Sequence, residues 1–319
     1  MASYENEISV SKYNPEQRKL WDEFVSSSKN GVFLFYRDFM EYHSDRFKDH
    51  SLLFFKKGHL VGLLPANVKD NILCSHGGLT FGGVISSYDV TISTALMLEI
   101  FGQLILHCKH EGIREILYEP VPFIYHSVPA DEDLYALFRH NADLIGRSVS
   151  SCIPISGKLP FIRNRNRNIQ KAKENNLFVK RSFDFKSCMK IFAEALMKRH
   201  EAKPAHTGEE IELLANRFPD NIKLFGSYKN DTMLGGVIVF ESKNVAHAQY
   251  GANSEEGREL GAEDLAFDYL INDYYKNKKY FDFGISTEKS GRILNEGLIR
   301  YKAGFGACPT MYDLYKLQV

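Results

Sequence analysis

Residues 280–307 read YFDFGISTEKSGRILNEGLIRYKAGFGA, and this stretch decides how the rest of the chain is interpreted. Its start, 280–283, has the pattern of a short buried strand that carries one carboxylate, Asp282. A polar loop follows Gly284, and Lys302 comes twenty residues after the carboxylate, close to two further glycines. Because a buried carboxylate needs partners, a strand that ends in one and is followed by a lysine is more typical of a functional site than of a core.

The composition is that of a globular protein. Its 319 residues exceed the usual size of one domain, so we expect one large domain or two moderate ones. Forty basic and forty acidic residues leave no net charge to attract nucleic acid or an anionic membrane, and any site for a polyanion must be local. The five cysteines are scattered without a CxxC pair, which indicates reduced thiols in a cytoplasmic protein and argues against a structural metal site.

The sequence contains no pattern that predicts a membrane span. The first ten residues, MASYENEISV, have neither the basic start nor the apolar centre of a signal peptide. The most apolar segment, 95–106, is interrupted by Glu99, Gly102 and Gln103 and falls short of the roughly 20 residues that cross a bilayer. We therefore expect a soluble, cytoplasmic protein.

The two halves of the chain repeat one order of elements, in which helical pattern is followed by strand, turn, strand, strand, helix and strand. In the first half, the expected elements are a helix at 15–28, strands at 51–55, 60–68, 79–85 and 113–118, and a helix from a cap at Asp89 or Thr91 to about residue 110. In the second half they are helices at 185–199, 208–217 and 261–275 and strands at 222–228, 233–241, 245–250 and 280–283. Two similar α/β units explain this repetition, although a common pattern can also recur by chance.

A basic segment lies between the halves. Residues 163–173 read RNRNRNIQKAK and follow Pro160, which predicts a helix with five positive charges in eleven residues. One interpretation is a solvated linker helix, and the other is a local patch for the phosphates of a nucleotide cofactor or of an RNA acceptor end. The run contains no aromatic residue on which bases could stack, so it does not by itself favour RNA. We expect an N-terminal unit at 1–157, a basic linker helix region at 158–180 and a C-terminal unit at 181–319.

These motifs, in this order, resemble an acyltransferase superfamily. Two strand–strand–helix–strand cores in tandem are similar to the GNAT acyltransferase fold, and the chain resembles its Fem-type branch, which contains peptidoglycan aminoacyltransferases. The matching pieces are NIQKAK at 168–173, DFG at 282–284, YKAGFG at 301–306 and SHGGLTFGG at 75–83. The resemblance covers about residues 30–315 and lacks the helical arm of longer members, since no long heptad run is present. It implies an α/β fold with mixed sheets, in which two GNAT-like units pack around a central cleft.

The resemblance also implies a position for the donor. In GNAT cores, backbone N–H groups at the start of the helix after the fourth strand bind a pyrophosphate, because the helix dipole favours anions there. The matching positions are Arg258, Gly261 and Ala262, and Lys302 and Phe305 of the closing segment are implied to lie near the same donor. Glu263 stands where the family pattern has a small residue and, with Glu259, places negative charge there. Acyl-CoA is the expected donor, and an aminoacyl-tRNA is the alternative.

Five residues are candidates for catalysis. His200 and His206 flank the start of the second unit, and a neutral imidazole can take a proton near physiological pH, although a histidine at a helix end often serves only as a cap. Tyr250 closes the fourth strand and can donate a proton, although a strand aromatic often only packs. Asp282 and Lys302 are open to two interpretations. They form a structural pair, or Lys302 places its positive charge on a developing oxyanion or on a phosphate.

Further residues are candidates for substrate binding in the cleft between the units. The glycine-rich loop of the first unit offers His76 and Gly77, and the end of its last strand offers Glu119. The remaining candidates are Arg199, Gln249, Ser286 and Asn295. The sequence thus predicts an N-acyltransferase that acts on the amine of a small metabolite or a cell-envelope precursor, with contact to a tRNA acceptor end in the alternative. The mismatch at Glu263 leaves a non-catalytic tandem-GNAT binding protein as a second class.

Overall fold

The computed structural model describes residues 8–88, 93–200 and 204–319, and the side chains of Arg199 and His200 are outside the described part. The chain divides into two units. The first comprises the residues up to Ser148 with Thr287–Ile293 and Met311–Val319, and the second comprises Val149–Ser286 with Leu294–Thr310. The chain therefore returns to the first unit after it has built the second, and the basic helix belongs to the second unit.

The first unit contains two groups of strands and is covered by helix α3 (Thr94–His110). One sheet has the order β1-β2-β3-β6, and the other group runs β4-β5-β7 and continues into β16. Helix α3 presents one apolar side to the strands, and Leu96, Ile100 and Phe101 are buried there. The strands are β1 (Ile8–Lys12), β2 (Leu52–Lys56), β3 (His59–Leu64), β4 (Asn67–Lys69), β5 (Ile72–Cys74), β6 (Ile85–Ser86) and β7 (Glu115–Tyr118), and the other helices are α1 (Arg18–Ser26), α2 (Arg37–Met40) and α4 (Glu132–Arg139).

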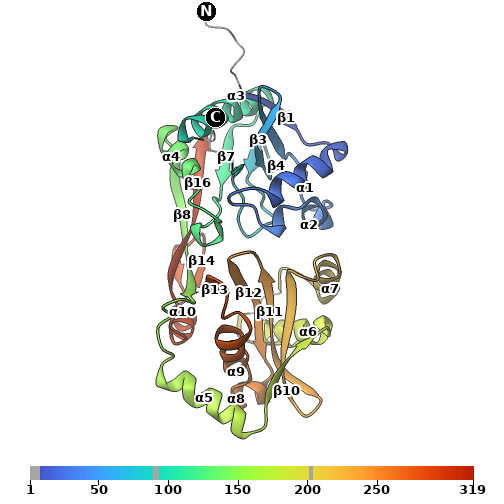
Figure 1. Ribbon diagram of the computed structural model, residues 1–319, viewed down its shortest axis with the longest axis vertical. Helices are drawn as coiled ribbons and strands as arrows, with labels where there is room; N and C mark the ends of the chain where they lie inside the picture. The colour runs from blue at the N-terminus through green and yellow to red at the C-terminus, as the bar shows by residue number, and fades with distance from the viewer. Residues whose placement is uncertain (1–7, 89–92, 201–203) are drawn as a thin grey trace, which may run out of the picture. The chain divides into compact units, whose positions relative to one another are not determined.

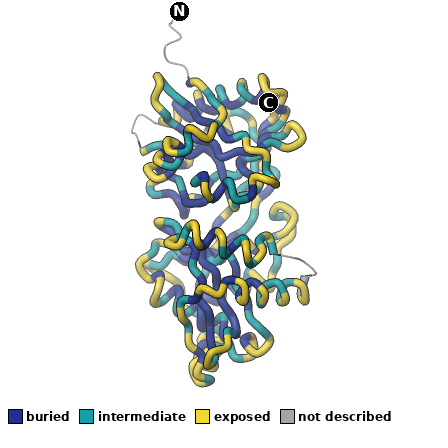
Figure 2. Tube along the Cα trace, turned by 90° about the vertical axis from the view of Figure 1, so that its right-hand side faces the viewer, coloured by how far each residue is buried: buried dark blue, intermediate teal, exposed yellow. Residues whose placement is uncertain are grey.

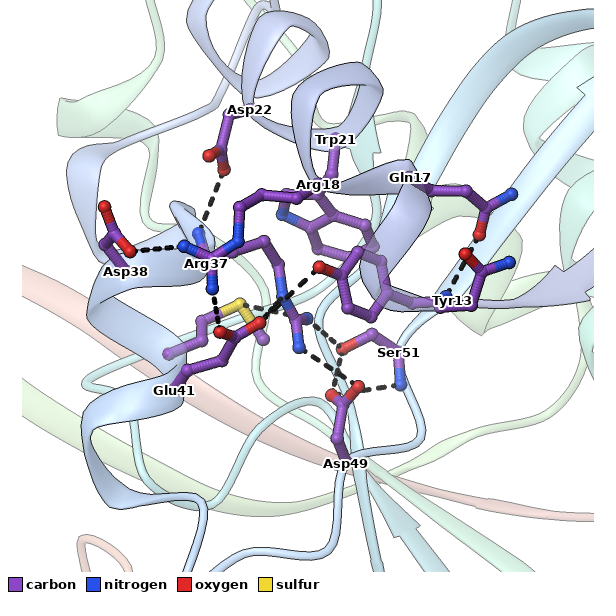
Figure 3. Close-up of polar contacts among 12 residues, drawn as sticks. Tyr13, Gln17, Arg18, Trp21, Asp22, Arg37, Asp38, Glu41, Asp49 and Ser51 are labelled. Carbon is purple, nitrogen blue, oxygen red and sulfur yellow. Dashed lines mark hydrogen bonds and ion pairs between the residues drawn. The ribbon is translucent and has the colours of Figure 1, made fainter.

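A buried arginine ties the first helices of this unit to its sheet (Figure 3). Arg37 is only 2% exposed, and its guanidinium donates to Ser51 Oγ at 3.2 Å and to Asp49 Oδ2 at 3.1 Å. It also donates to Glu41 at 3.1 Å and lies 3.7 Å from the centroid of the Tyr13 ring. A buried charge is tolerated only when it is paired in this way, so we assign this cluster a structural role.

The second unit is a twisted sheet with helices on both faces. Its strands have the order β8-β13-β12-β11-β10-β9, in which β12 and β13 are parallel. Helix α9 packs on one face and α6 on the other (Figure 1). The strands that lie wholly in the second unit are β9 (Phe178–Ser182), β10 (Ile222–Lys229), β11 (Thr232–Glu241), β12 (Val245–Asn253) and β13 (Tyr280–Ile285). Three strands are shared between the units, β8 (Asp143–Pro154), β15 (Ile293–Leu294) and β16 (Cys308–Gln318), and β14 (Thr287–Glu288) belongs to the first unit. The helices are α5 (Arg163–Glu174), α6 (Phe185–His200), α7 (Gly208–Arg217), α8 (Glu255–Leu260), α9 (Ala262–Tyr269) and α10 (Glu296–Ala303).

The core of the second unit lies between α9 and the sheet. Ala266 and Phe267 of α9 pack against Val237, Ala246 and Phe281 of three neighbouring strands. Because side chains alternate along a strand, His247 and Asp282 must point to the opposite face, where α6 lies. Figure 2 shows the buried residues along the strands and the exposed ones in the surrounding helices and turns.

The mixed α/β fold predicted from the sequence is confirmed, and most expected elements occur. The strand expected at 60–68 is instead two strands, β3 and β4, because Pro65 has no N–H to donate to a ladder. Of the extended stretch at 79–85, only Ile85 joins a strand. Helix α3 is capped by Ser93, and the caps expected at Asp89 or Thr91 lie outside the described residues.

Candidate functional site

Strands β12 and β13 separate part-way along their length. They pair in parallel at Val245–Tyr280, Ala246–Phe281 and His247–Asp282, and no later residues pair in the described structure. After Asp282 the register of β13 shifts, and Ile285 pairs with Ser150 of β8. The edge of β12 beyond His247 is therefore left without a paired strand on this side, and its backbone donors and acceptors there do not bond to β13.

Asp282 is the centre of a buried polar group at this branch point. Its side chain is fully buried, and its Oδ2 lies 2.8 Å from Nδ1 of His247. Its Oδ1 accepts a hydrogen bond from Ser150 Oγ at 2.6 Å. A carboxylate at Nδ1 fixes the imidazole with its proton on that nitrogen, so Nε2 is the acceptor. The carboxylate of Asp282 thus orients the imidazole of His247, an arrangement in which the histidine can act as a base.

His247 belongs to no recognisable motif in the sequence. The residue is the third of β12, and its partner is 35 residues away in the chain. Only the parallel register of β12 and β13 places the two side chains on one face. One signal could have suggested His247: it is the single histidine in an otherwise mostly apolar strand, and the strand with Asp282 follows later in the chain.

Lys302 is buried beside the branch point. Its Nζ donates to the carbonyl oxygens of Gly284 and Ile285, both at 2.8 Å. Burial lowers the pKa of Lys302 from 10.5 to about 8, an effect that the charge of Asp282 partly offsets. The lysine therefore anchors α10 to the shifted end of β13, and Asp282 takes its hydrogen bonds from His247 and Ser150. Phe305, expected near the donor, is fully buried in the core.

Tyr250 and His206 form a second polar pair on β12. The Tyr250 hydroxyl lies 2.5 Å from Nδ1 of His206, and the Tyr250 ring packs edge-on against Phe192 of α6. A bulge in the pairing of β11 and β12 leaves Gln249 as the extra residue, since Ile238 pairs with Tyr250 and the next residue pairs with Ala248. The bulge returns Tyr250 to the face on which His247 lies.

Two candidates predicted to bind substrate carry unsatisfied buried atoms. Gln249 Oε1 and Ser286 Oγ are buried and have no hydrogen-bond partner among the described residues. Gln249 follows the branch point on β12, and Ser286 follows it at the end of β13. Since buried polar atoms are nearly always paired, these two atoms are available to a polar ligand or to water at the branch point.

A cavity of about 450 Å³ lies along the unpaired end of β12. Its walls are the end of β12, the middle of α6, the start of α9 and the start of α10. The predicted substrate residue Asn295 lines it and also caps α10, because its Oδ1 accepts from the N–H of Leu298 at 3.0 Å. The lining residues are Phe192, Ala195, Leu196, Gly251, Ala252, Asn253, Glu263, Asn295, Gly297, Leu298 and Tyr301.

The start of α9, where a pyrophosphate was expected, is occupied by other groups. Gly261 is left-handed with φ of 80°, and a Cβ there would lie 2.5 Å from the backbone oxygen of Asn168 in α5. Ala262 is fully buried, and Arg258 is exposed. Asp264, in the first turn, accepts hydrogen bonds from Arg165 at 2.6 Å and Asn168 at 2.5 Å. The first turn of α9 therefore carries a buried carboxylate, Asp264, that is paired with two side chains of α5.

The remaining candidates are divided between the units. His76, Gly77 and Glu119 belong to the first unit, where Ser75 Oγ accepts from the Glu119 N–H at 2.7 Å. Burial lowers the pKa of His76 to about 3 and raises that of Glu119 to about 7. The Gly77 N–H donates to Asn67 at 2.8 Å. The side chains of Arg199 and His200, at the end of α6, lie outside the described residues.

The described residues contain neither a metal-binding cluster nor a membrane-spanning helix. Within residues 8–88, 93–200 and 204–319, no group of three or more His, Cys, Asp or Glu side chains could hold a metal ion. None of the helices in this part of the chain is both long and apolar enough to cross a membrane.

Comparison with known proteins matches much of the second unit to a family. Residues 161–303 match the family model described as an acetyltransferase (GNAT) domain. The match agrees with the resemblance found in the sequence over this part of the chain and supports the prediction of an N-acyltransferase. The separation of β12 and β13 and the cavity beside it lie within this matched range. A search of the curated proteins found no match.

Solved structures share the fold of the whole chain. The chain is similar to FemX, with 14% identity, 96% of each chain covered and a TM-score of 0.64. It is also similar to L-PGS from Bacillus licheniformis, with 9% identity, 96% of this chain and 92% of that chain covered and a TM-score of 0.63. A tandem GNAT protein from the clavulanic acid biosynthesis pathway matches with 8% identity, 98% of each chain covered and a TM-score of 0.52. At these identities the likeness concerns the fold alone.

Proposed function

We propose that the protein transfers an acyl group from a thioester donor of the acyl-CoA type to an amine. One observation carries the proposal: the strands of the GNAT domain separate at His247 and Asp282, next to unsatisfied polar atoms of Gln249 and Ser286. The acceptor is the amine of a small metabolite or of a cell-envelope precursor, and the reaction takes place in the cytoplasm.

The reaction needs one proton acceptor and one proton donor. The amine nitrogen forms a bond to the carbonyl carbon of the thioester, the carbon–sulfur bond breaks, and one proton leaves the amine while the thiolate gains one. His247 is placed to take the first proton at Nε2, because Asp282 holds its other nitrogen. Tyr250, on the same face and bonded to His206, is placed to supply the second.

The donor is held along the free edge of β12. Backbone groups beyond His247 and the amide of Gln249 offer hydrogen bonds to an extended chain such as pantetheine. At the start of α9, the carboxylate of Asp264 adds negative charge where the diphosphate of CoA is expected. An aminoacyl-tRNA remains the alternative donor, because it presents no diphosphate at this position.

The test is the release of free thiol from acetyl-CoA in the presence of primary amines, with mass spectrometry of the product. We expect the His247→Gln variant to lower kcat by about 100-fold or more, the usual contribution of a general base. The His59→Gln variant changes an exposed histidine of the first unit and should retain wild-type activity.

Donor binding provides an independent measurement. A donor present at about 100 times its Kd stabilises the folded protein by about 2.7 kcal/mol, which a thermal melt detects. A shift with acetyl-CoA supports the proposal, and a shift with charged tRNA alone favours the alternative donor. No shift with either donor, together with no thiol release, would mean that the protein is a binding protein without transferase activity.

A further inference from the structure

The outer face of helix α5 carries a stripe of positive charge that the proposed reaction does not use. Arg163, Arg167 and Lys171 stand at every fourth position, so they lie on one face of the helix, and all three are exposed. An α-helix rises about 1.5 Å per residue, so neighbours in this cation stripe are about 6 Å apart along the axis. Within the described part of the chain, none of these side chains is paired with a carboxylate, and Arg167 donates only to the neutral side chain of Asn164, at 2.7 Å.

The opposite face of α5 is fixed to the second unit. Ile169 is buried there, and Arg165 donates to Asp264 of α9 at 2.6 Å. Lys173, at the edge of this face, donates to Asp268 at 3.1 Å. Figure 1 shows α5 at the margin of the second unit, beside α9. Because α9 neutralises the inner cations and prevents the helix from rotating, the cation stripe is left facing solvent.

An exposed apolar turn leads into the cation stripe. Leu159 is 54% exposed and Ile162 is 49% exposed, although both are large aliphatic residues. The turn is nevertheless held in place, since the Ile162 N–H donates to the carbonyl oxygen of Gly304 at 2.9 Å. The Phe161 ring packs edge-on against Phe305, with 5.2 Å between the ring centroids. The two aliphatic side chains are therefore presented to solvent by an ordered turn at the start of α5.

This combination fits one kind of anionic partner. Cations that flank exposed aliphatic groups match a lipid surface, which has phosphates at its headgroups and acyl chains just beneath them. Nucleic acid would use the cations but gain nothing from aliphatic side chains, and α5 has no aromatic ring on which a base could stack. The one carboxylate of α5, Glu174, lies in its last turn, away from the apolar turn, and accepts from Gln170 at 3.1 Å.

We propose that the apolar turn and the cation stripe dock the second unit on the surface of an anionic phospholipid membrane. Leu159 and Ile162 enter the boundary between headgroups and acyl chains, while the three cations meet lipid phosphates. The contact is small, so docking is reversible and peripheral. Because the chain as a whole has no net charge, the attraction comes from this face alone. The inference is independent of the transfer reaction, and its failure would leave the proposed function untouched.

Sedimentation of the full-length protein with sucrose-loaded vesicles tests the proposal. One set of vesicles is pure phosphatidylcholine, and the other is an equimolar mixture with phosphatidylglycerol. We expect the partition coefficient to be at least about tenfold larger for the anionic vesicles, because each Lys or Arg near such a surface adds to the attraction. The excess should disappear as salt is raised from about 0.1 M to about 1 M, since the screening length falls from about 10 Å to about 3 Å. Equal partitioning into both kinds of vesicle overturns the proposal.

A charge variant and a matched control locate the surface. The triple variant Arg163→Gln, Arg167→Gln and Lys171→Gln should lower partitioning into anionic vesicles at least about tenfold. The control removes the same charge from exposed lysines of the first unit and should bind as the wild type does; its changes are Lys48→Gln, Lys57→Gln and Lys109→Gln. Equal losses in both variants mean that total charge decides, which overturns the proposal. If the first variant does not fold, the lipid and salt dependence of the wild type decides alone.

The apolar turn separates a membrane from a nucleic acid. The double variant Leu159→Ser and Ile162→Ser should weaken binding to anionic vesicles about tenfold and leave the salt dependence as it is. Wild-type binding in this variant overturns the proposal. A short RNA duplex serves as the competing probe. Binding of the RNA that needs the cation stripe but not the apolar turn, without binding to vesicles, assigns the stripe to nucleic acid and also overturns the proposal.

Discussion

Replacement of Lys302 by methionine should change how stability depends on pH. The side chain is 6% exposed, and its pKa is lowered from 10.5 to about 8 by burial. Between these two values the unfolded chain binds a proton that the folded chain has lost, so stability of the wild type rises with pH. The full effect corresponds to about 3 kcal/mol, and about 2 kcal/mol of it falls between pH 7 and about pH 9.5.

The Lys302→Met variant should lack this rise. At neutral pH it loses two hydrogen bonds from a charged donor, roughly 1.5 to 3 kcal/mol each, but it also avoids the cost of burying the charge. The second term offsets only part of the first, so we expect the variant to be less stable than the wild type by about 1 to 2 kcal/mol near pH 7 and by about 2 kcal/mol more near pH 9.5.

Urea denaturation of both proteins at the two pH values measures this difference, since other titrating groups cancel. The Lys276→Met variant changes an exposed lysine of the same unit and should show the same difference from wild type at both pH values. If the difference between the Lys302→Met variant and the wild type does not change with pH, the lysine is not held as the structure shows. The transfer activity of the Lys302→Met variant is measured separately at neutral pH, because a purely structural lysine would leave kcat unchanged.

Three further predictions concern other residues. The Tyr250→Phe variant should keep its packing on Phe192 and its melting temperature but lower kcat by about 100-fold, and wild-type turnover would exclude the hydroxyl from proton transfer. In the first unit, burial raises the pKa of Asp133 to about 7. The folded chain therefore holds a proton that the unfolded chain has lost, and wild-type stability should fall as the pH rises from about 4 to about 7. In denaturation experiments the Asp133→Asn variant should remove up to about 4 kcal/mol of that fall. The Arg37→Met variant removes the counter-charge of Asp49 and one of the two cations beside Glu41, which keeps Arg18. It should lower the free energy of unfolding by about 3 kcal/mol, and a loss below about 1 kcal/mol would contradict the role assigned to this cluster.

Local patterns were sufficient for the elements and for their order. Alternating and continuous apolar runs predicted β10 to β13, and a one-sided apolar pattern predicted α9, because these signals depend on neighbours a few residues apart. The same local information showed that Asp282 is buried and that Glu263 departs from the pyrophosphate pattern. Errors arose where backbone chemistry intervened, as at Pro65, which divides one expected strand into two.

The candidate site depended on contacts between distant segments. Asp282 meets His247 from 35 residues away and Ser150 from 132 residues away, and only the register of three strands brings them together. That register follows from how whole faces are buried, which no short stretch of sequence encodes. For the same reason Lys302, expected near the donor, is bonded to the backbone of β13. The sequence by itself determined the class of fold and the closing strand, whereas the tertiary structure decided which polar groups share a face, because partners for buried charges exist only once the strands have paired.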